Sequence, residues 1–283
     1  MRAIENAEVR AWLDMYAAIP PHHAQRYNPE IMQVDGVTLT RCREIPFSHF
    51  NSVLDLGGAT PATESQVDAI LACYREAGIP RFTVIHNPHA QPPQLLEWLE
   101  ARGLRPRGGW ERVYRAGGHF TTPEPAVNGS VEPVSREIGS EWASFLVNSY
   151  GLPTGPWLEQ LVERPGWHHA VLRREGRIVA ARSLFVSAGG WAWLGVEAPV
   201  PGIMAPSYAD DFALTHALVV DGLRRGVTHF AADIEAPSAA RHAGVRELEG
   251  ARVRVAVRAD AVRERVTASA AGRAALPRME AHR

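Results

Sequence analysis

The sequence predicts an α/β protein, more closely of the α+β type, with two domains that each hold a mixed, mostly antiparallel sheet flanked by helices. Helical and strand periodicities alternate along both halves of the 283 residues. Between the halves, residues 118–130 are rich in Gly, Pro, Thr and Ser and lack apolar periodicity, which is typical of a linker. We therefore expect domains at 1–117 and 131–258, followed by an Ala- and Arg-rich tail at 259–283.

The N-terminal half alternates strand and helix signals. Thr63 and Gln66 form a capping box ahead of apolar residues at helical spacing, and this pattern predicts a helix at 64–77. The next elements expected are a strand, a helix that ends at a glycine and a second strand, at 82–85, around 95–102 and at 110–114.

The C-terminal half opens with a strand at 131–134 and a helix that ends at Gly151. Three consecutive strands joined by glycine turns follow, and such a series predicts an antiparallel meander at 168–174, 177–185 and 190–196. The remaining expected elements are a helix, a strand, a short helix and a strand, at 212–225, 229–234, 237–243 and 252–258.

Composition excludes several function classes. The formal charge of −1 offers no positive patch for nucleic acid, and no apolar run reaches the length that spans a bilayer. All 30 basic residues are arginines, so chemistry that needs a lysine amine is excluded, including pyridoxal phosphate enzymes. The twelve histidines form no metal-binding motif, and Cys42 and Cys73 are expected to be buried free thiols. We expect a cytoplasmic protein without a metal, a nucleic-acid partner or a membrane partner.

The stretch "SVLDLGGATP", residues 52–61, is similar in pattern to a nucleotide-binding turn. A methyltransferase turn needs glycines two, four and six residues after its acid, whereas Asp55 is followed there by Gly57, Ala59 and Pro61. Asn87 stands where an acid should end the next strand. We therefore interpret the stretch as a structural turn, in which glycine allows the backbone to reverse.

Three segments of the C-terminal half, "GWAWLGVEAP", "ALTHALVVDGLRRGVTHFAADI" and "AARHAGVRELEGARVRVAVR", resemble the GCN5-related N-acetyltransferase fold. In the N-terminal half, "HFNSVLDLGGATP", "QVDAILACYREAGIPRFTVIHNP" and "LLEWLEARGLRPRGGWERVYR" look like a second, shorter copy. The resemblance implies a tandem protein in which the C-terminal domain is active and the other is non-catalytic. It further implies transfer of an acyl group from acetyl-CoA or another acyl thioester to an amine of a small molecule or peptide, and a possible homodimer.

In that family a strand ends in V-x-P and an R-x-x-G-x-G/A turn holds the coenzyme A pyrophosphate on backbone N–H groups and a helix start. Aligning Pro199 with the family proline puts Gly202 at the arginine and Ala205 at the first glycine, so the loop departs from the pattern. The implied coenzyme A contacts are Val196, Ala198, Gly202 and Ala205. We expect two neighbouring strands to separate past Val196 and to leave a slot for the thioester arm.

The resemblance also implies catalytic roles. Glu197 lies on the strand beside the acyl acceptor and is the candidate general base. The family's tyrosine general acid falls on Ala240, so Tyr208 in the loop is the candidate replacement. Asp210 and Asp211 are expected to cap the following helix, where their charge would repel a pyrophosphate. The alternative hypothesis is a fold relative that does not bind coenzyme A and acts as a ligand-binding, partner-binding or non-acyl-transfer protein.

Overall fold

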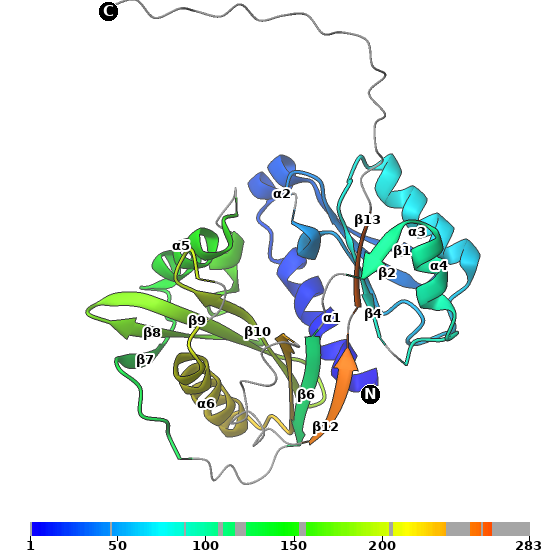
Figure 1. The fold of residues 1–283 in the computed structure, drawn as a ribbon. Helices are drawn as coiled ribbons and strands as arrows, with labels where there is room; N and C mark the ends of the chain where they lie inside the picture. The colour runs from blue at the N-terminus through cyan, green and yellow to red at the C-terminus, as the bar shows by residue number, and fades with distance from the viewer. Residues whose placement is uncertain are drawn as a thin grey trace, which may run out of the picture.

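The computed structural model places two sheets side by side, with helix α1 between them (Figure 1). It describes nine stretches of the chain, namely 2–45, 47–87, 89–106, 110–116, 123–152, 157–203, 206–235, 250–255 and 257–261. The helices and short 3-10 turns are α1 (Arg2–Ala17), α2 (Pro21–Tyr27), η1 (Ser48–Phe50), α3 (Glu64–Glu76), α4 (Leu95–Ala101), α5 (Gly139–Tyr150), η2 (Trp157–Leu161) and α6 (Tyr208–Arg224).

The strands of the described residues form two sheets. Their bounds are β1 (Pro29–Val34), β2 (Val37–Cys42), β3 (Ser52–Leu54), β4 (Thr83–His86), β5 (Leu104–Pro106), β6 (Trp110–Ala116), β7 (Ser130–Pro133), β8 (Trp167–Arg174), β9 (Arg177–Val186), β10 (Trp191–Pro199), β11 (His229–Glu235), β12 (Gly250–Val255) and β13 (Val257–Ala261). The first sheet has six strands in the order β1-β2-β3-β4-β13-β5, and the second has seven in the order β12-β6-β11-β10-β9-β8-β7.

Each sheet contains one parallel pair among antiparallel neighbours. In the first sheet β3 runs parallel to β4, and in the second β10 runs parallel to β11. The predicted meander of three strands is confirmed as β8, β9 and β10, which pair in sequence order and antiparallel. The predicted fold class, two mixed and mostly antiparallel sheets flanked by helices, is therefore what the chain adopts.

Sheet membership differs from the predicted domain boundaries because two strands are exchanged between the halves. Strand β6 ends the predicted N-terminal domain, yet it pairs with β11 and β12 in the second sheet. Strand β13 runs into the predicted tail and pairs with β4 and β5 in the first sheet. The single strand expected at 252–258 is thus two strands, β12 and β13, that belong to different sheets. The short helix expected at 237–243 lies outside the described residues.

Two helices illustrate how local sequence sets the element boundaries. Helix α3 begins after Thr63, whose hydroxyl accepts the Gln66 N–H while the Gln66 side chain accepts the Thr63 N–H, which confirms the predicted capping box. Helix α6 begins four residues earlier than predicted, because Ser207 is its cap and accepts the N–H of Asp210. Its first turn therefore includes Tyr208.

Both faces of the second sheet are covered. Along β9, Ala180 and Leu184 face a core formed with α6, whereas Ala181 and Phe185 face a core formed with α1, α5 and η2. Helix α1, which the periodicity analysis did not identify, presents fully or almost fully buried small and flexible side chains at four-residue spacing, Ala7, Ala11 and Met15. The first helix of the chain therefore packs on the sheet of the second half.

Within the described part of the chain, no helix has both the length and the apolar composition needed to cross a bilayer.

Candidate functional site

The parallel strands β10 and β11 separate after a short paired stretch. Residues 191–194 pair with 229–232, and beyond Leu194 the two strands follow different neighbours. Strand β10 continues to Pro199 along β9, while β11 continues to Glu235 along β6. The expected separation is therefore present, and it begins two residues earlier than predicted, at Leu194 rather than at Val196. In open α/β sheets, ligands bind at the carboxyl ends of parallel strands that separate in this way.

A bulge in β10 lies beside this gap. Gly195 pairs with Ser183 and Ala198 pairs with Ala181, so two residues of β10, Val196 and Glu197, oppose the single residue between those partners. Val196 has a φ of +50°, which is a strained conformation for a β-branched residue. Strain of this kind is concentrated at functional sites, and here it sets the direction of the strand end that carries Glu197.

Arg182 is the residue opposite the bulge, and it holds Glu197 in place. Its Nη1 donates to Glu197 Oε2 at 3.1 Å and forms a short ion pair with Asp211 of α6. The Arg182 side chain is only 5% exposed, whereas that of Glu197 is 34% exposed. Burial lowers the pKa of Arg182, but the charges of Asp211 and Glu197 outweigh it, so the net pKa is raised and the guanidinium stays charged. Glu197 is thus an oriented carboxylate with access to solvent.

The start of α6 differs from the expectation that Asp210 and Asp211 cap it. Ser207 is the cap, and each aspartate instead binds an arginine of the sheet. Asp210 pairs with Arg174 of β8, where Nη1 lies 3.1 Å from Oδ2, and Asp211 pairs with Arg182 of β9. Because these pairs are mostly buried, the two aspartates tie α6 to the sheet and their charge is compensated locally.

The end of α5 supplies two hydroxyl groups that sequence analysis did not identify. Ser149 Oγ donates to the Pro199 carbonyl at 2.6 Å, and the Tyr150 hydroxyl donates to the Glu197 carbonyl. Tyr150 is 39% exposed, and burial, followed by the charge of Glu197, raises the pKa of its hydroxyl. Tyr150 therefore places a hydroxyl group at the backbone of the candidate base.

The other residues implied by the resemblance are dispersed. Tyr208 is the first residue of α6 rather than a loop residue, is 38% exposed and stacks on Phe212 with ring centroids 5.9 Å apart. Gly202 is exposed with a φ of +86°, and a Cβ there would meet no atom within 4 Å. Ala198 is fully buried in the core. Ala205 lies outside the described residues, as does Ala240.

The site suits the thioester arm of an acyl-CoA better than its pyrophosphate. The gap between β10 and β11 offers a strand edge beside Glu197, as a thioester arm requires. The loop from Val200 to Ser207 carries no basic side chain in its sequence, and the arginines bonded near the start of α6 already bind Asp210 and Asp211. A pyrophosphate therefore meets no basic side chain of the loop, although the N-terminus of α6 still favours anions. Among the described residues, no group of three His, Cys, Asp or Glu side chains lies together as metal ligands do.

The stretch at 52–61 forms the corresponding turn of the first sheet. Gly57 has a φ of +77°, and a Cβ there would lie 2.7 Å from the Gln91 carbonyl. The Gly57 carbonyl accepts the Gln91 N–H at 2.8 Å, and the Ala62 N–H donates to the Gln91 carbonyl at 2.6 Å. The presence of glycine at position 57 is therefore explained by structure, because only a residue without a side chain allows the two backbone segments to approach this closely.

The chain was compared with known proteins at the levels of sequence and structure. Its sequence matches no family model and no curated protein. A GCN5-related N-acetyltransferase from Kribbella flavida matches its structure over 92% of this chain and 94% of the other, with 14% identity and a TM-score of 0.63.

Two further solved structures match over most of this chain. A tandem GNAT protein from the clavulanic acid biosynthesis pathway matches over 80% of this chain and 78% of the other, with 17% identity and a TM-score of 0.53. A glucosamine N-acetyltransferase region of a fungal multi-domain β-N-acetylglucosaminidase has a TM-score of 0.54 at 12% identity, over 82% of this chain and 30% of the other. At these identities the likeness is one of fold.

Proposed function

We propose that this chain, which has the fold of the tandem GCN5-related N-acetyltransferases, is an N-acyltransferase whose active site lies in the second sheet. The donor is acetyl-CoA or another acyl thioester, and the acceptor is an amine of a small molecule or a peptide. The observation that carries the proposal is the separation of β10 and β11 past Leu194, together with the strained bulge at Val196 that precedes Glu197 on the separated strand end. The first sheet is assigned no catalytic role.

Glu197 is the proposed general base. One of its oxygens is fixed by Arg182, so the carboxylate has a defined direction, and its partial exposure leaves it within reach of an entering amine or of a bridging water. Removing the proton from the amine gives a nucleophile that attacks the thioester carbonyl. Peptide N–H groups of β10 past Leu194 are the proposed donors to the oxygen that becomes negative during this attack.

Tyr150 is the proposed proton donor to the leaving thiolate, in preference to Tyr208. Its hydroxyl donates to the backbone carbonyl of Glu197, which places a phenol proton at the strand end. Tyr208 stacks on the outside of α6 with Phe212. A hydroxyl group and a carboxyl group at the same strand end, one from α5 and one from β10, are the pair of groups that general acid–base catalysis of acyl transfer uses.

Calorimetric titration of the protein with acetyl-CoA and with longer acyl-CoAs tests donor binding. Saturable binding of the acyl-CoAs, and also of coenzyme A without an acyl group, supports the proposal. Because the loop from Val200 to Ser207 provides no basic side chain, we expect weaker dependence on salt than a site with a phosphate-binding arginine would give. Absence of binding at millimolar concentrations contradicts the use of coenzyme A as the donor carrier.

The substitution Glu197→Gln tests the proposed base. It keeps the shape of the side chain and a polar contact to Arg182 but removes the proton acceptor, so kcat should fall by about 10²-fold or more. The measurement is acetyl-CoA turnover with a panel of primary amines, in parallel with far-UV circular dichroism to verify folding. Glu137→Gln, at an exposed position, is the matched control and should keep full activity. An unchanged rate in Glu197→Gln removes Glu197 from the mechanism.

A second candidate function is that of a binding protein with this fold that does not use coenzyme A. It is favoured by the hydroxyls of Ser149 and Tyr150, which already occupy the Pro199 and Glu197 carbonyls at the strand end. The same titration separates the two candidates, since this one predicts no response to any acyl-CoA.

A further inference from the structure

One buried arginine connects helix α6 with the strand end that carries Glu197. Arg182 of β9 donates from Nη1 to Glu197 Oε2 at 3.1 Å, and the same nitrogen forms the ion pair with Asp211. A guanidinium Nη atom carries two hydrogens, so Nη1 has one for each carboxylate. The two acids therefore share the single positive charge of Arg182 through the same nitrogen.

The two carboxylates that share Arg182 differ in their exposure to solvent. The side chain of Asp211 is 11% exposed, whereas that of Glu197 is 34% exposed. Water screens a buried charge pair less than an exposed one. Asp211 is therefore expected to balance most of the guanidinium charge, while Glu197 keeps a directional hydrogen bond from it.

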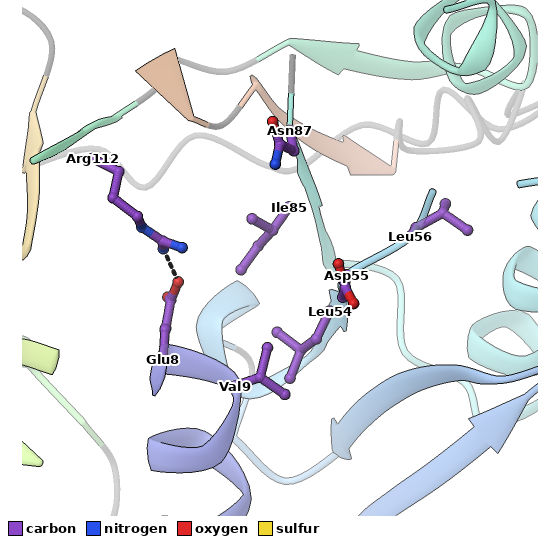
Figure 2. A pocket seen from close by; sticks show the side chains of 8 residues that line it. All are labelled: Glu8, Val9, Leu54, Asp55, Leu56, Ile85, Asn87 and Arg112. Carbon is purple, nitrogen blue, oxygen red and sulfur yellow. Dashed lines mark hydrogen bonds and ion pairs between the residues drawn. The ribbon is translucent and has the colours of Figure 1, made fainter. Parts of the chain in front are cut away.

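The second buried arginine with two carboxylates lacks this asymmetry. Arg112 binds Glu8 (Figure 2) and Asp233, whose side chains are only 13% and 16% exposed. Both of its acids are thus mostly enclosed by protein, as in a structural cluster. In the Arg182 cluster, by contrast, Glu197 is the carboxylate that solvent reaches.

The other groups around the cluster leave this charge balance in place. Within the described ranges, the groups that act electrostatically on Arg182 are Asp211, Glu197 and the Tyr150 hydroxyl of α5. The neighbouring Asp210 forms its own pair with an arginine of β8, so that pair carries no net charge. Asp211 is therefore the acid that offsets the charge of Arg182 from the side of α6.

A general base has to be fixed in direction and also has to be basic. An arginine beside a carboxylate fixes it but favours its ionised form, typically by about 1 to 3 pKa units, and thereby makes it a weaker base. A second carboxylate on the same arginine opposes that effect without breaking the hydrogen bond. The arrangement of Asp211, Arg182 and Glu197 meets both requirements.

We propose that Asp211 is a positioning residue of the site, which acts through Arg182 to keep Glu197 both oriented and basic. Its importance for catalysis rests on the proposed function, whereas its effect on the titration of Glu197 does not. A base accepts a proton only when it is ionised, so activity is lost as the pH falls through the titration midpoint of Glu197. The charge of Asp211 holds that midpoint, and the acidic limb of kcat/KM, at higher pH.

The titration of Glu197 is measured directly by carboxyl ¹³C NMR of the full-length protein labelled at glutamate, and Glu197→Gln identifies the signal by its loss. Asp211→Asn removes the charge but keeps an amide oxygen that accepts a hydrogen bond from Arg182. We expect the Glu197 midpoint to fall by about one pH unit. The acidic limb of kcat/KM should move with it, and kcat/KM above the limb should fall about threefold because the base is weaker.

Asp210→Asn is the matched control. It removes the same charge from the adjacent residue in the first turn of α6, which also binds an arginine of the sheet, but not Arg182. The Glu197 midpoint should therefore change by less than about 0.3 unit. If Asp211 only tied α6 to the sheet, the two variants would behave alike.

Two variants of Arg182 keep the test conclusive if Asp211→Asn does not fold. Arg182→Gln leaves the charge of Asp211 without a cation, so the Glu197 midpoint should rise by about one unit. The double variant Asp211→Asn/Arg182→Gln removes one charge of each sign and leaves no unpaired charge between them. Its Glu197 midpoint should stay within about 0.3 unit of that of the unaltered protein.

The proposal is overturned if Asp211→Asn moves the Glu197 midpoint no further than Asp210→Asn does, or if the double variant moves it as far as a single variant. These outcomes are distinct from failure of the proposed function. A lowered midpoint in Asp211→Asn, in a protein that transfers no acyl group, supports the charge coupling and contradicts the acyltransferase. Acyl transfer with an unmoved midpoint contradicts the role of Asp211 alone.

Discussion

His169 shows how burial determines the behaviour of a single residue in this protein. Its ring nitrogens contact the Ser183 hydroxyl at 2.7 Å and the Leu161 carbonyl at 3.1 Å, and its ring lies 4.1 Å from that of Trp142. Burial lowers its pKa to about 4, although the Leu161 carbonyl opposes the shift. The adjacent His168 lies on the opposite face of β8 and contacts Asp221 of α6, as the two-residue period of a strand requires.

The lowered pKa of His169 predicts a loss of stability in mild acid. Above pH 6.5 the imidazole is neutral in both states, but between pH 6.5 and about 4 the unfolded chain binds a proton that the folded protein does not. The free energy of unfolding should therefore fall by about 3 kcal/mol over this range because of this residue. Urea unfolding at a series of pH values measures the effect, and His169→Gln should remove that part of the pH dependence. His22→Gln, at an exposed position, should retain it.

At the residue scale, sequence predicted the position of Glu197 but not its partners. Glu197 lies two residues before Pro199, which aligns with the proline that ends the corresponding strand of the family, so its place near the strand end could be inferred. Arg182 and Tyr150 lie 15 and 47 residues away from it in the chain. No local pattern marks them, because it is strand pairing and the packing of α5 that bring them to Glu197.

Element boundaries follow from capping chemistry, and α3 offers a direct test. Thr63→Ala removes the hydroxyl that accepts the Gln66 N–H and leaves that donor without its partner. The free energy of unfolding should fall by about 1 kcal/mol. Thr60→Ala changes an exposed threonine outside the helix and should have little effect. Equal stabilities of the two variants in urea would show that the capping box contributes nothing measurable.

Sequence predicted the elements best where a local signal marks their ends. The capping box fixed the start of α3, and the glycine turns separated β8, β9 and β10. The start of α6 was misplaced because Asp210 and Asp211 have the residue type of a cap, whereas Ser207 performs the capping and the aspartates bind arginines of the sheet. Two of the buried α1 positions are alanines, a small residue that carries little hydrophobic signal.

At the scale of the whole molecule, Arg112 joins three segments that are distant in sequence. From β6 it binds Glu8 of α1 and Asp233 of β11, and the Trp193 indole N–H also donates to Asp233 at 3.3 Å. A buried arginine with two carboxylates is costly to disrupt, because removing it leaves two buried charges without a partner. The halves are therefore connected by a charged cluster as well as by exchanged strands.

Arg112→Ala should lower the free energy of unfolding by about 3 to 5 kcal/mol. Because both sheets contain strands from both halves, guanidinium unfolding should remain a single transition, with fluorescence and circular dichroism giving the same midpoint. Arg225→Ala breaks an exposed pair with Asp221 and should cost less than about 1 kcal/mol. Two separate transitions in the unaltered protein would contradict the cooperative coupling expected here.

Sheet membership was the part of the architecture that sequence did not reveal. The segments that become β6 and β13 have ordinary strand patterns, and alternation in a strand indicates only which residues share a face. Which neighbour a strand selects depends on the three-dimensional path of the chain. For this reason the composition of residues 118–130 predicted a linker, but it held no information on the crossing of strands between the sheets.

The exchange of β13 has a consequence for how the protein is made. Strand β13 (Val257–Ala261) lies between β4 and β5. Strand β5 can therefore join the first sheet only after these residues have been synthesised. While the nascent chain is shorter than this, β4 has an unpaired edge, and such edges recruit other chains. The first sheet of the emerging chain is therefore incomplete until β13 has been synthesised.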